Sequence, residues 1–372
     1  MASYALSALL ALASSTLVTA QVPTIEPTPL ASLNFASPAD LPYQVEPNPV
    51  VRGSQFGFNQ CNSTTQNQQS LCQTMYVNSI DDFCLWGPDK PNSTISDTEG
   101  EEVAWCTKPH GARLIPNGAL QGVQFLKAPD YILVAGFIDQ TQVNIQDGDF
   151  GGELDPHGQD LAGNPMGGIV FSNAYSGSNT TYQQMVEWNL FIGGNQFCLK
   201  ICPTGAPGNN PAGYCRNTLD RLGCSVNSPN NAQKDVYEVC DSADMDLPGV
   251  YVSNGQTITY TQPPESLGAI TSIPFTATVP ASSNCTPFSS AALYTDIASV
   301  SGASTTPAAS ATPSGSGSVS GSAKPTSGSA TGSHSASAAG SSSTSTPNGA
   351  GAFGVSLVAG VIGVAFSVAF LA

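Results

Sequence analysis

Carboxylates gather between residues 147 and 160, where they form the densest group of potentially reactive side chains in the chain. Five of them lie within fourteen residues and are spaced mainly by glycine: Asp147, Asp149, Glu153, Asp155 and Asp160. Counted from Asp147, carboxylates occupy positions 1, 3, 7 and 9 and glycine occupies position 6, a spacing that can supply oxygen ligands to calcium. Position 12 is Gly158, where an EF-hand needs a bidentate glutamate, so the segment is not an EF-hand.

Three interpretations of this acidic loop stay open. The plainest is a solvated connector between strands. The second is a calcium site with Asp147, Asp149, Glu153 and Asp155 as ligands. The third is a glycosidase-like pair, which needs two carboxyl groups roughly 5–9.5 Å apart across a groove of sugar size. The sequence predicts no other cofactor.

Other catalytic signatures are scarce. Of the three histidines, His110 and His157 lie in the central part of the chain and His334 lies in a Ser-rich tract, so a three-histidine zinc site is excluded. His157 could bind a metal weakly together with neighbouring aspartates, but a turn or surface role is the simpler interpretation. The motifs Gly-x-Ser-x-Gly and His-Glu-x-x-His are both absent.

The cysteines indicate a disulfide framework, because an even number in an exported chain is typical of one. All ten are predicted to pair: Cys61, Cys72, Cys84, Cys106, Cys198, Cys202, Cys215, Cys224, Cys240 and Cys285. A long gap separates the first four from the last six, which favours two local clusters and leaves the connectivity open. Cys198 and Cys202 would share one face of a strand about 13 Å apart, so we expect each to bridge a different partner.

The elements that must position these residues are predicted to be strands. Short β-branched and aromatic runs between Gly, Pro and Asn breakers predict strands at 131–138, 185–191, 196–201, 236–239 and 249–260. Within the last run, Asn254-Gly255 predicts a type I′ hairpin. The best helix candidate is 117–126. The fold class expected is all-β, a disulfide-rich antiparallel β-sandwich-like ectodomain followed by a disordered Ser/Thr-rich stalk, with one or two β domains left open.

Both ends carry processing signals. Residues 1–20 resemble a secretory signal peptide, and 21–50 form an arm with seven prolines that favours extended backbone. The ectodomain is predicted at 51–290 and an O-glycosylated stalk at 291–348. Residues 349–372 end in an apolar tail with no charge beyond it, which is typical of a glycosylphosphatidylinositol attachment signal; a spanning helix is the alternative. The candidate attachment sites are Asn348 and the group Gly340, Ser341, Ser342 and Ser343.

Net charge limits the class of partner. The chain carries 26 acidic and 10 basic residues, for a net charge of −16. Such a surface repels phosphate backbones and anionic lipid heads, so nucleic acid is excluded as a partner. Contact with a membrane is expected only through the lipid anchor.

Four sequons predict N-glycosylation, at Asn62, Asn92, Asn179 and Asn284. Asn227-Ser228-Pro229 is disqualified by its proline. Use of Asn284 could compete with disulfide formation at the adjacent Cys285.

Several motifs together resemble one known family. They are Gln55-Phe56-Gly57-Phe58-Asn59 with Cys61, Asp82-Phe83-Cys84-Leu85-Trp86, the run from Thr98 to Asp130, the acidic loop, and Gly163-Asn164-Pro165-Met166-Gly167-Gly168. Over about residues 50–285 the chain resembles the basidiomycete immunoreactive mannoproteins, also called macrophage-activating glycoproteins. The resemblance implies a mannosylated, wall- or membrane-tethered fungal glycoprotein whose glycans are recognised by host mannose-binding lectins. It supplies no catalytic residues.

The function predicted from the sequence is that of a lipid-anchored mannoprotein on the outer face of the plasma membrane or in the cell wall, without catalysis. Its expected partners are cell-wall glycans and, through its own glycans, immune lectins. The first alternative is a secreted carbohydrate-active enzyme or glycan-binding wall protein that uses carboxylates of the 147–160 loop. A further alternative is a glycan-binding module that uses an exposed Trp86 or Trp105.

Overall fold

The computed structural model describes residues 28–48, 50–203 and 213–296. The predicted signal peptide, most of the stalk and the candidate lipid-attachment sites lie outside these residues.

The described part of the chain is built mainly from strands, which confirms the all-β class. The first sheet holds, in spatial order, β4 (Arg113–Leu114), β3 (Val103–Cys106), β2 (Asp82–Gly87), β1 (Thr74–Ser79), β8 (Ile169–Ser172) and β9 (Gln183–Gln184). The second holds β15 (Ser282–Pro287), β12 (Tyr237–Ser242), β5 (Leu120–Lys127), β6 (Ile132–Ile138), β11 (Gln196–Cys202), β10 (Glu187–Gly193) and β7 (Gly152–Leu154). Most neighbours are antiparallel, but β3–β4, β1–β8 and β5–β12 are parallel, so both sheets are mixed.

Helices are few and short. They are α1 (Ile95–Thr98), α2 (Gly223–Asn227) and α3 (Ser290–Leu293), with 3₁₀ turns η1 (Leu30–Ser32), η2 (Pro38–Asp40), η3 (Gln140–Val143), η4 (Asp220–Leu222) and η5 (Glu265–Leu267). The helix expected at 117–126 is wrong, because this segment forms most of β5. Its backbone pairs on both edges, with β6 and β12, and this tertiary pairing overrides a weak local helix signal.

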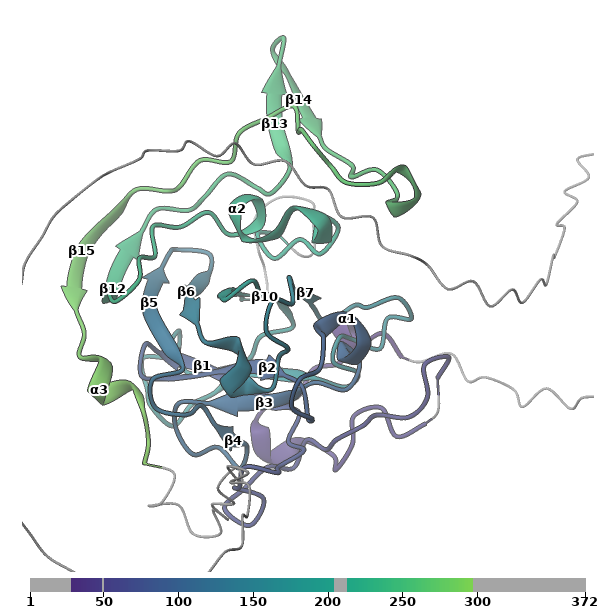
Figure 1. Cartoon of the computed structure of the whole chain (residues 1–372), viewed down its shortest axis with the longest axis vertical. Coiled ribbons are helices and arrows are strands. Elements are labelled where there is room, and N and C mark those ends of the chain that lie inside the picture. Colours follow the sequence, from purple (N-terminus) through teal and green to yellow (C-terminus); the bar gives the residue numbers. More distant parts are fainter. Residues whose placement is uncertain (1–27, 49, 204–212, 297–372) are drawn as a thin grey trace, which may run out of the picture. The chain divides into compact units, whose positions relative to one another are not determined.

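The two sheets pack around one core, and this resolves the choice between one and two β domains for the described residues. Phe83 of β2 stacks on Phe197 of β11 with ring centroids 6.2 Å apart. The ring centroids of Trp86 of β2 and Trp188 of β10 are 5.9 Å apart. Contacts between β2 and two strands of the other sheet make the arrangement a sandwich, as predicted (Figure 1). Trp86 and Trp105 are buried, which removes the interpretation of either as an exposed sugar platform.

Alternation along β11 divides the second sheet between two hydrophobic clusters. Phe197, Leu199 and Ile201 point into the main core. Cys198 and Cys202 point to the opposite face, where a smaller cluster forms under the segment that carries α2. Alternate strand residues face opposite sides of a sheet, so the two cysteines share a face as expected.

The disulfides follow the predicted division into two groups, and no cysteine of the described chain is free. The pairs are Cys61–Cys72, Cys84–Cys106, Cys198–Cys224, Cys202–Cys215 and Cys240–Cys285. Cys198 and Cys202 bridge different partners. Four cysteines therefore form two bridges in or next to the first sheet. The other six form three bridges, each with one cysteine on β11 or β12 of the second sheet.

The segments at the two ends of the described chain pack on the sandwich. In the proline-rich arm Leu30 and Leu41 are buried, whereas Tyr43 is exposed. At the other end Leu293 is fully buried, and the Tyr294 hydroxyl accepts from the Leu120 amide at 2.9 Å. Residues 291–296, which composition assigned to the stalk, thus contact the domain.

The hairpin β13 (Val250–Ser253) and β14 (Gln256–Thr259) forms at the predicted Asn-Gly turn, and its strands pair with each other alone (Figure 1). Asn254 and Gly255 both have positive φ, 52° and 76°, which a type I′ turn requires.

Candidate functional site

An acidic pocket of about 470 Å³ lies beside β7, the edge strand of the second sheet. Five carboxylates from four separate segments line it: Glu99 just after α1, Glu153 and Asp155 on and after β7, Asp220 in η4 and Glu265 in η5. Its remaining polar side chains are Ser96, Gln159, Asn164, Asn217 and Arg221. The fold therefore concentrates negative charge where loops from distant parts of the sequence meet.

Glu153 lies at the floor of this pocket. Its register partner is Phe191 of β10, so its side chain points to the face of the sheet that carries Lys200 and the smaller cluster. The residue is only 8% exposed, and neither carboxyl oxygen makes a hydrogen bond. Burial raises the pKa of Glu153 well above its usual range, and the nearby charges of Asp155 and Asp220 raise it further.

Lys200 of β11 lies on the same face of the sheet as Glu153 and is fully buried. Its ammonium donates to the Asn227 carbonyl and to Met245 Sδ. Burial lowers the pKa of Lys200 to about 7, while the charge of Glu153 opposes this shift.

Asp155 and Glu99 line the same pocket as Glu153. Asp155 Oδ1 accepts from the His157 and Gly158 amides at 2.7 and 3.1 Å, an arrangement typical of an Asx turn. Burial nevertheless raises the pKa of Asp155. Burial also raises the pKa of Glu99; Arg52 opposes the shift, and Asp155 adds to it.

The four predicted calcium ligands separate in space. Glu153 and Asp155 line the pocket, but Asp147 is exposed and Asp149 Oδ2 accepts from the Ile95 amide at 2.9 Å. In the described chain these carboxylates do not bring three oxygens within 4.8 Å of one another. The group that does so, Glu238 with Cys240 and Cys285, contains a disulfide, whose sulfurs are not free to bind a metal. Calcium binding by the loop stays an untested prediction.

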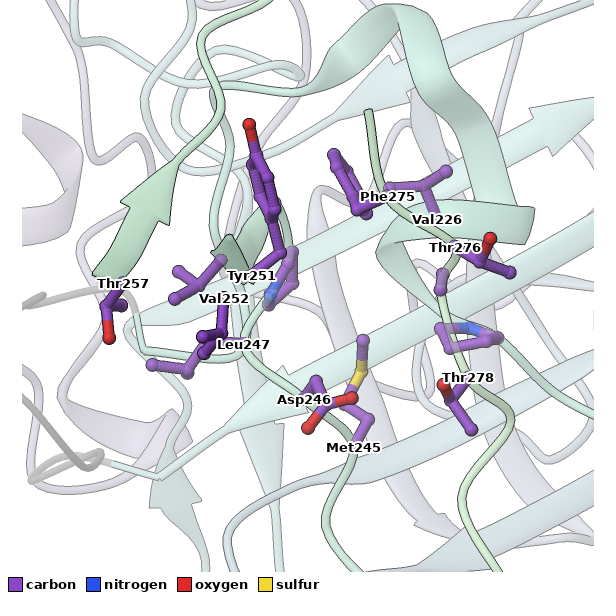
Figure 2. A pocket seen from close by; sticks show the side chains of 15 residues that line it. Val226, Met245, Asp246, Leu247, Tyr251, Val252, Thr257, Phe275, Thr276 and Thr278 are labelled. Carbon is purple, nitrogen blue, oxygen red and sulfur yellow. The ribbon is translucent and has the colours of Figure 1, made fainter. Parts of the chain in front are cut away.

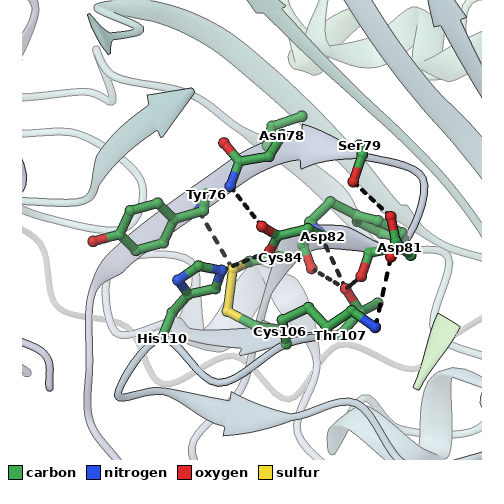
Figure 3. A network of polar contacts seen from close by, with 12 residues as sticks. Tyr76, Asn78, Ser79, Asp81, Asp82, Cys84, Cys106, Thr107 and His110 are labelled. Carbon is green, nitrogen blue, oxygen red and sulfur yellow. Dashed lines mark hydrogen bonds and ion pairs between the residues drawn. A yellow bond between two sulfur atoms is a disulfide. The ribbon is translucent and has the colours of Figure 1, made fainter. Parts of the chain in front are cut away.

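His157 and His110 each pair with a carboxylate. His157 Nε2 lies 3.0 Å from Glu187 Oε2, and this hydrogen bond raises the pKa of His157. His110 Nε2 lies 2.6 Å from Asp82 Oδ1, and its ring stacks on Tyr76 at 4.1 Å (Figure 3). Burial opposes ionisation of Asp82, but the bonds from His110 and Asn78 hold its pKa below the usual range. The network in Figure 3 surrounds the Cys84–Cys106 bridge and fastens the chain after β3 to β2, which is a structural role.

A second cavity, of about 460 Å³, lies against the hairpin and is lined by both apolar and polar groups (Figure 2). Met245, Leu247, Tyr251 and Phe275 line it, and Asp246 is its charged side chain. Sequence patterns did not indicate it, because its walls come from four separate segments between Val226 and Thr278.

Sequence reasoning also missed three carboxylates of the acidic pocket: Glu99, Asp220 and Glu265. Each stands in a polar stretch that resembles an ordinary loop. Only their distance from Glu153 in space, not in sequence, marks them.

All four predicted glycosylation sites are accessible. Asn62, Asn92, Asn179 and Asn284 are exposed, although Asn284 Nδ2 donates to Asp241 Oδ2 at 2.9 Å. Asn227, in the disqualified sequon, is fully buried.

Five disulfides in a β-sandwich of this size define the class: a protein that matures in an oxidising, extracellular environment. The chain is 40% identical over 219 residues to Appressorium protein ROW2 of Mycosarcoma maydis, a match that covers 58% of this chain and 72% of that protein. It is 44% identical over 198 residues to Appressorium protein ROW1 of the same fungus, covering 53% of this chain and 46% of that protein. The chain belongs to the family of these appressorium proteins.

Both relatives come from a basidiomycete, as the resemblance in the sequence implied; neither bears a mannoprotein name. No family model matches the chain, and no solved structure matches it. Among the described residues, no helix is both long and apolar enough to cross a membrane.

Proposed function

We propose that this protein is a lipid-anchored surface glycoprotein of a basidiomycete, whose disulfide-bonded sandwich acts outside the cell without catalysis, at the appressorium named in its relatives. The observation that carries the proposal is the kinship with ROW2, which extends over 72% of that protein. The exposed glycosylation sites and the terminal hydrophobic tail support the glycosylated, anchored form. Mannose-type glycans recognised by lectins are part of the proposal.

The alternative of a carbohydrate-active enzyme finds less support in the geometry. A glycosidase acid must reach the leaving-group oxygen of its substrate. Both carboxyl oxygens of Glu153 are closed to solvent, and Asp155 is committed to an Asx turn. A protein that only binds a glycan does not need contact between a carboxyl group and the glycosidic oxygen.

The test is to follow the full-length protein in the living fungus. An epitope placed after the signal peptide should appear on the surface of infection structures, and phosphatidylinositol-specific phospholipase C should release it from protoplast membranes. The released protein should bind a mannose-specific lectin until its glycans are removed. Retention of residues 353–372 in the mature protein, seen by mass spectrometry, would contradict the anchor. Release of reducing sugar from wall polysaccharides by purified protein, lost in Glu153→Gln, would favour the enzyme.

A further inference from the structure

The acidic pocket is electrostatically incomplete. Arg221 is the one basic residue among its lining side chains, and its guanidinium is already committed: it donates to the Pro263 carbonyl at 2.6 Å and to the Gly268 carbonyl. Arg52, which lies nearby, forms a salt bridge of 2.7 Å with Asp160. The buried Lys200 is coupled to Glu153, so in the described chain the cations near the pocket are fewer than its five carboxylates.

Glu153 gives an independent sign that a cation belongs here. Its side chain lines the pocket and is more than nine-tenths buried, and neither oxygen has a hydrogen bond of good geometry; the buried Lys200 and the Asn189 amide are the groups that favour its charged form. A buried polar group left unsatisfied is costly, so such groups are rare in folded proteins. Because these oxygens are closed to solvent, a positively charged occupant of the pocket would stabilise the Glu153 carboxylate through its electric field and not by direct contact.

The spacing of the carboxylates argues against a single metal ion. In the described chain the pocket brings no three of its carboxylate oxygens within 4.8 Å of one another, whereas calcium needs six to eight oxygens around one point. An extended organic cation with several separated charges fits five dispersed carboxylates better. The volume, about 470 Å³, is that of a small-molecule site.

Uncharged polar and aromatic side chains near the carboxylates indicate which other chemical groups the ligand carries. Gln159 and Asn217 add uncharged hydrogen-bonding side chains to the wall, which suits a ligand that also carries hydroxyl groups. An adjoining cavity of about 490 Å³ shares Gly151, Gly152, Asp220 and Arg221 with the pocket. Phe150 lines this adjoining cavity of about 490 Å³ and is 94% exposed. Its aromatic face can therefore contact a sugar ring or an ammonium group.

We propose that the acidic pocket and the adjoining Phe150 surface bind a cationic amino-sugar chain, a polymer of glucosamine units, with carboxylates on the amines and Phe150 against a sugar ring. This deepens the proposed surface role by naming the class of wall glycan. It is tested on purified protein, so its failure would leave the anchoring and the location of the protein untouched.

The experiment is calorimetric titration of the full-length chain in mild detergent at about pH 5.5, which lies above the ordinary pKa of a carboxyl group and below that of an amine. The probes are a glucosamine hexamer, the N-acetylglucosamine hexamer of equal length, spermine and calcium chloride. We expect the glucosamine hexamer to bind at least about ten-fold more tightly than either the acetylated hexamer or spermine. Equal affinity for the acetylated hexamer would overturn the role of charge, and equal affinity for spermine would overturn the role of the sugar. No binding of the hexamer, or its displacement by millimolar calcium, would overturn the proposal as a whole.

Variants assign the binding to this pocket. Asp220→Asn combined with Glu265→Gln should weaken binding of the glucosamine hexamer about ten-fold or more. The matched control, Asp147→Asn with Asp235→Asn, removes the same charge from two exposed aspartates outside the pocket and should change affinity less than about two-fold. Phe150→Ala, which alters no core contact, should reduce affinity several-fold. Equal losses in the pocket variant and the control would show attraction to net charge alone and would contradict the site.

Discussion

At the scale of single residues, two buried ionisable side chains whose charged forms are energetically unfavourable are coupled to each other, and one of them lines the acidic pocket. Glu153 and Lys200 are buried ionisable residues, and their pKa values shift in opposite directions toward neutral forms. Burial is the main cause for both, because removing a charge from water is expensive in a medium of low dielectric constant. Glu153 lines the acidic pocket and is coupled to Lys200, so the burial of these two ionisable groups lowers the stability of the fold next to a cavity that can receive a ligand.

Glu153→Gln keeps the shape of the side chain and removes its charge, so the variant should be the more stable protein once the carboxyl would ionise. The folded-state pKa lies above the unfolded value of about 4.3. The stability linked to the protonated carboxyl is therefore complete below that pH and is lost as the pH rises toward the folded pKa. We expect similar urea midpoints near pH 4 and an advantage for the variant of about 1–3 kcal/mol above pH 6.

Tryptophan fluorescence during urea unfolding at several pH values would measure this difference. The groups that face Glu153 are Asp155, Asp220, Lys200 and the Asn189 amide. Lys200, with a pKa of about 7, is largely protonated through most of this window. Asp147→Asn is the control, since Asp147 is exposed. A variant less stable than the wild type at pH 7 would mean that Lys200 already satisfies the carboxylate.

At the scale of elements, strands with little apolar surface depend on covalent links. All six residues of β15 are exposed, and the strand is attached to β12 by its hydrogen-bond ladder and by Cys240–Cys285. Edge strands of this kind bury too little to hold themselves in place. The disulfide replaces the missing hydrophobic contact.

Removing Cys240–Cys285 should cost more stability than removing Cys61–Cys72. The two bridges close loops with sequence separations of 45 and 11 residues. The chain-entropy model gives about 4 and about 3 kcal/mol for loops of these lengths. Each bridge joins one buried cysteine to one that is less buried, so double Cys→Ala variants make comparable cavities. Guanidinium unfolding should rank the midpoints accordingly, and equal losses would mean that strain or residual structure outweighs loop length.

At the scale of the whole molecule, charge and covalent chemistry define where the protein can work. A net charge of −16 over the 372 residues repels anionic polymers and attracts cationic ones. Five disulfides hold the sandwich together in an oxidising environment. Both features suit life outside the cell.

Glycosylation is the whole-molecule prediction. Enzymatic removal of N-glycans in heavy-oxygen water should label Asn62, Asn92, Asn179 and Asn284, because all four are exposed. Asn227 is the internal control, since it is buried and followed by Ser-Pro, and should stay unlabelled. Peptide mass spectrometry reads each site separately. Two or more unlabelled sites among the four would contradict the prediction that exposure governs their use.

The sequence alone determined the class of the protein, because local signals are enough for it. The runs at 131–138 and 196–201 became β6 and β11, Asn254-Gly255 became the hairpin turn, and the cysteine gap separated the bridges into two groups. Turn chemistry, strand composition and redox compartment act over a few residues or over composition, and they can be recognised without tertiary structure.

Tertiary structure alone decided which residues meet. It placed most of the expected helix 117–126 in the interior strand β5 (Leu120–Lys127), because two neighbouring strands pair with it. It split the acidic loop, leaving Asp147 in solvent and sending Glu153 and Asp155 to join Glu99, Asp220 and Glu265. Such a pocket depends on contacts between segments far apart in the sequence, and no local pattern encodes the distance between them.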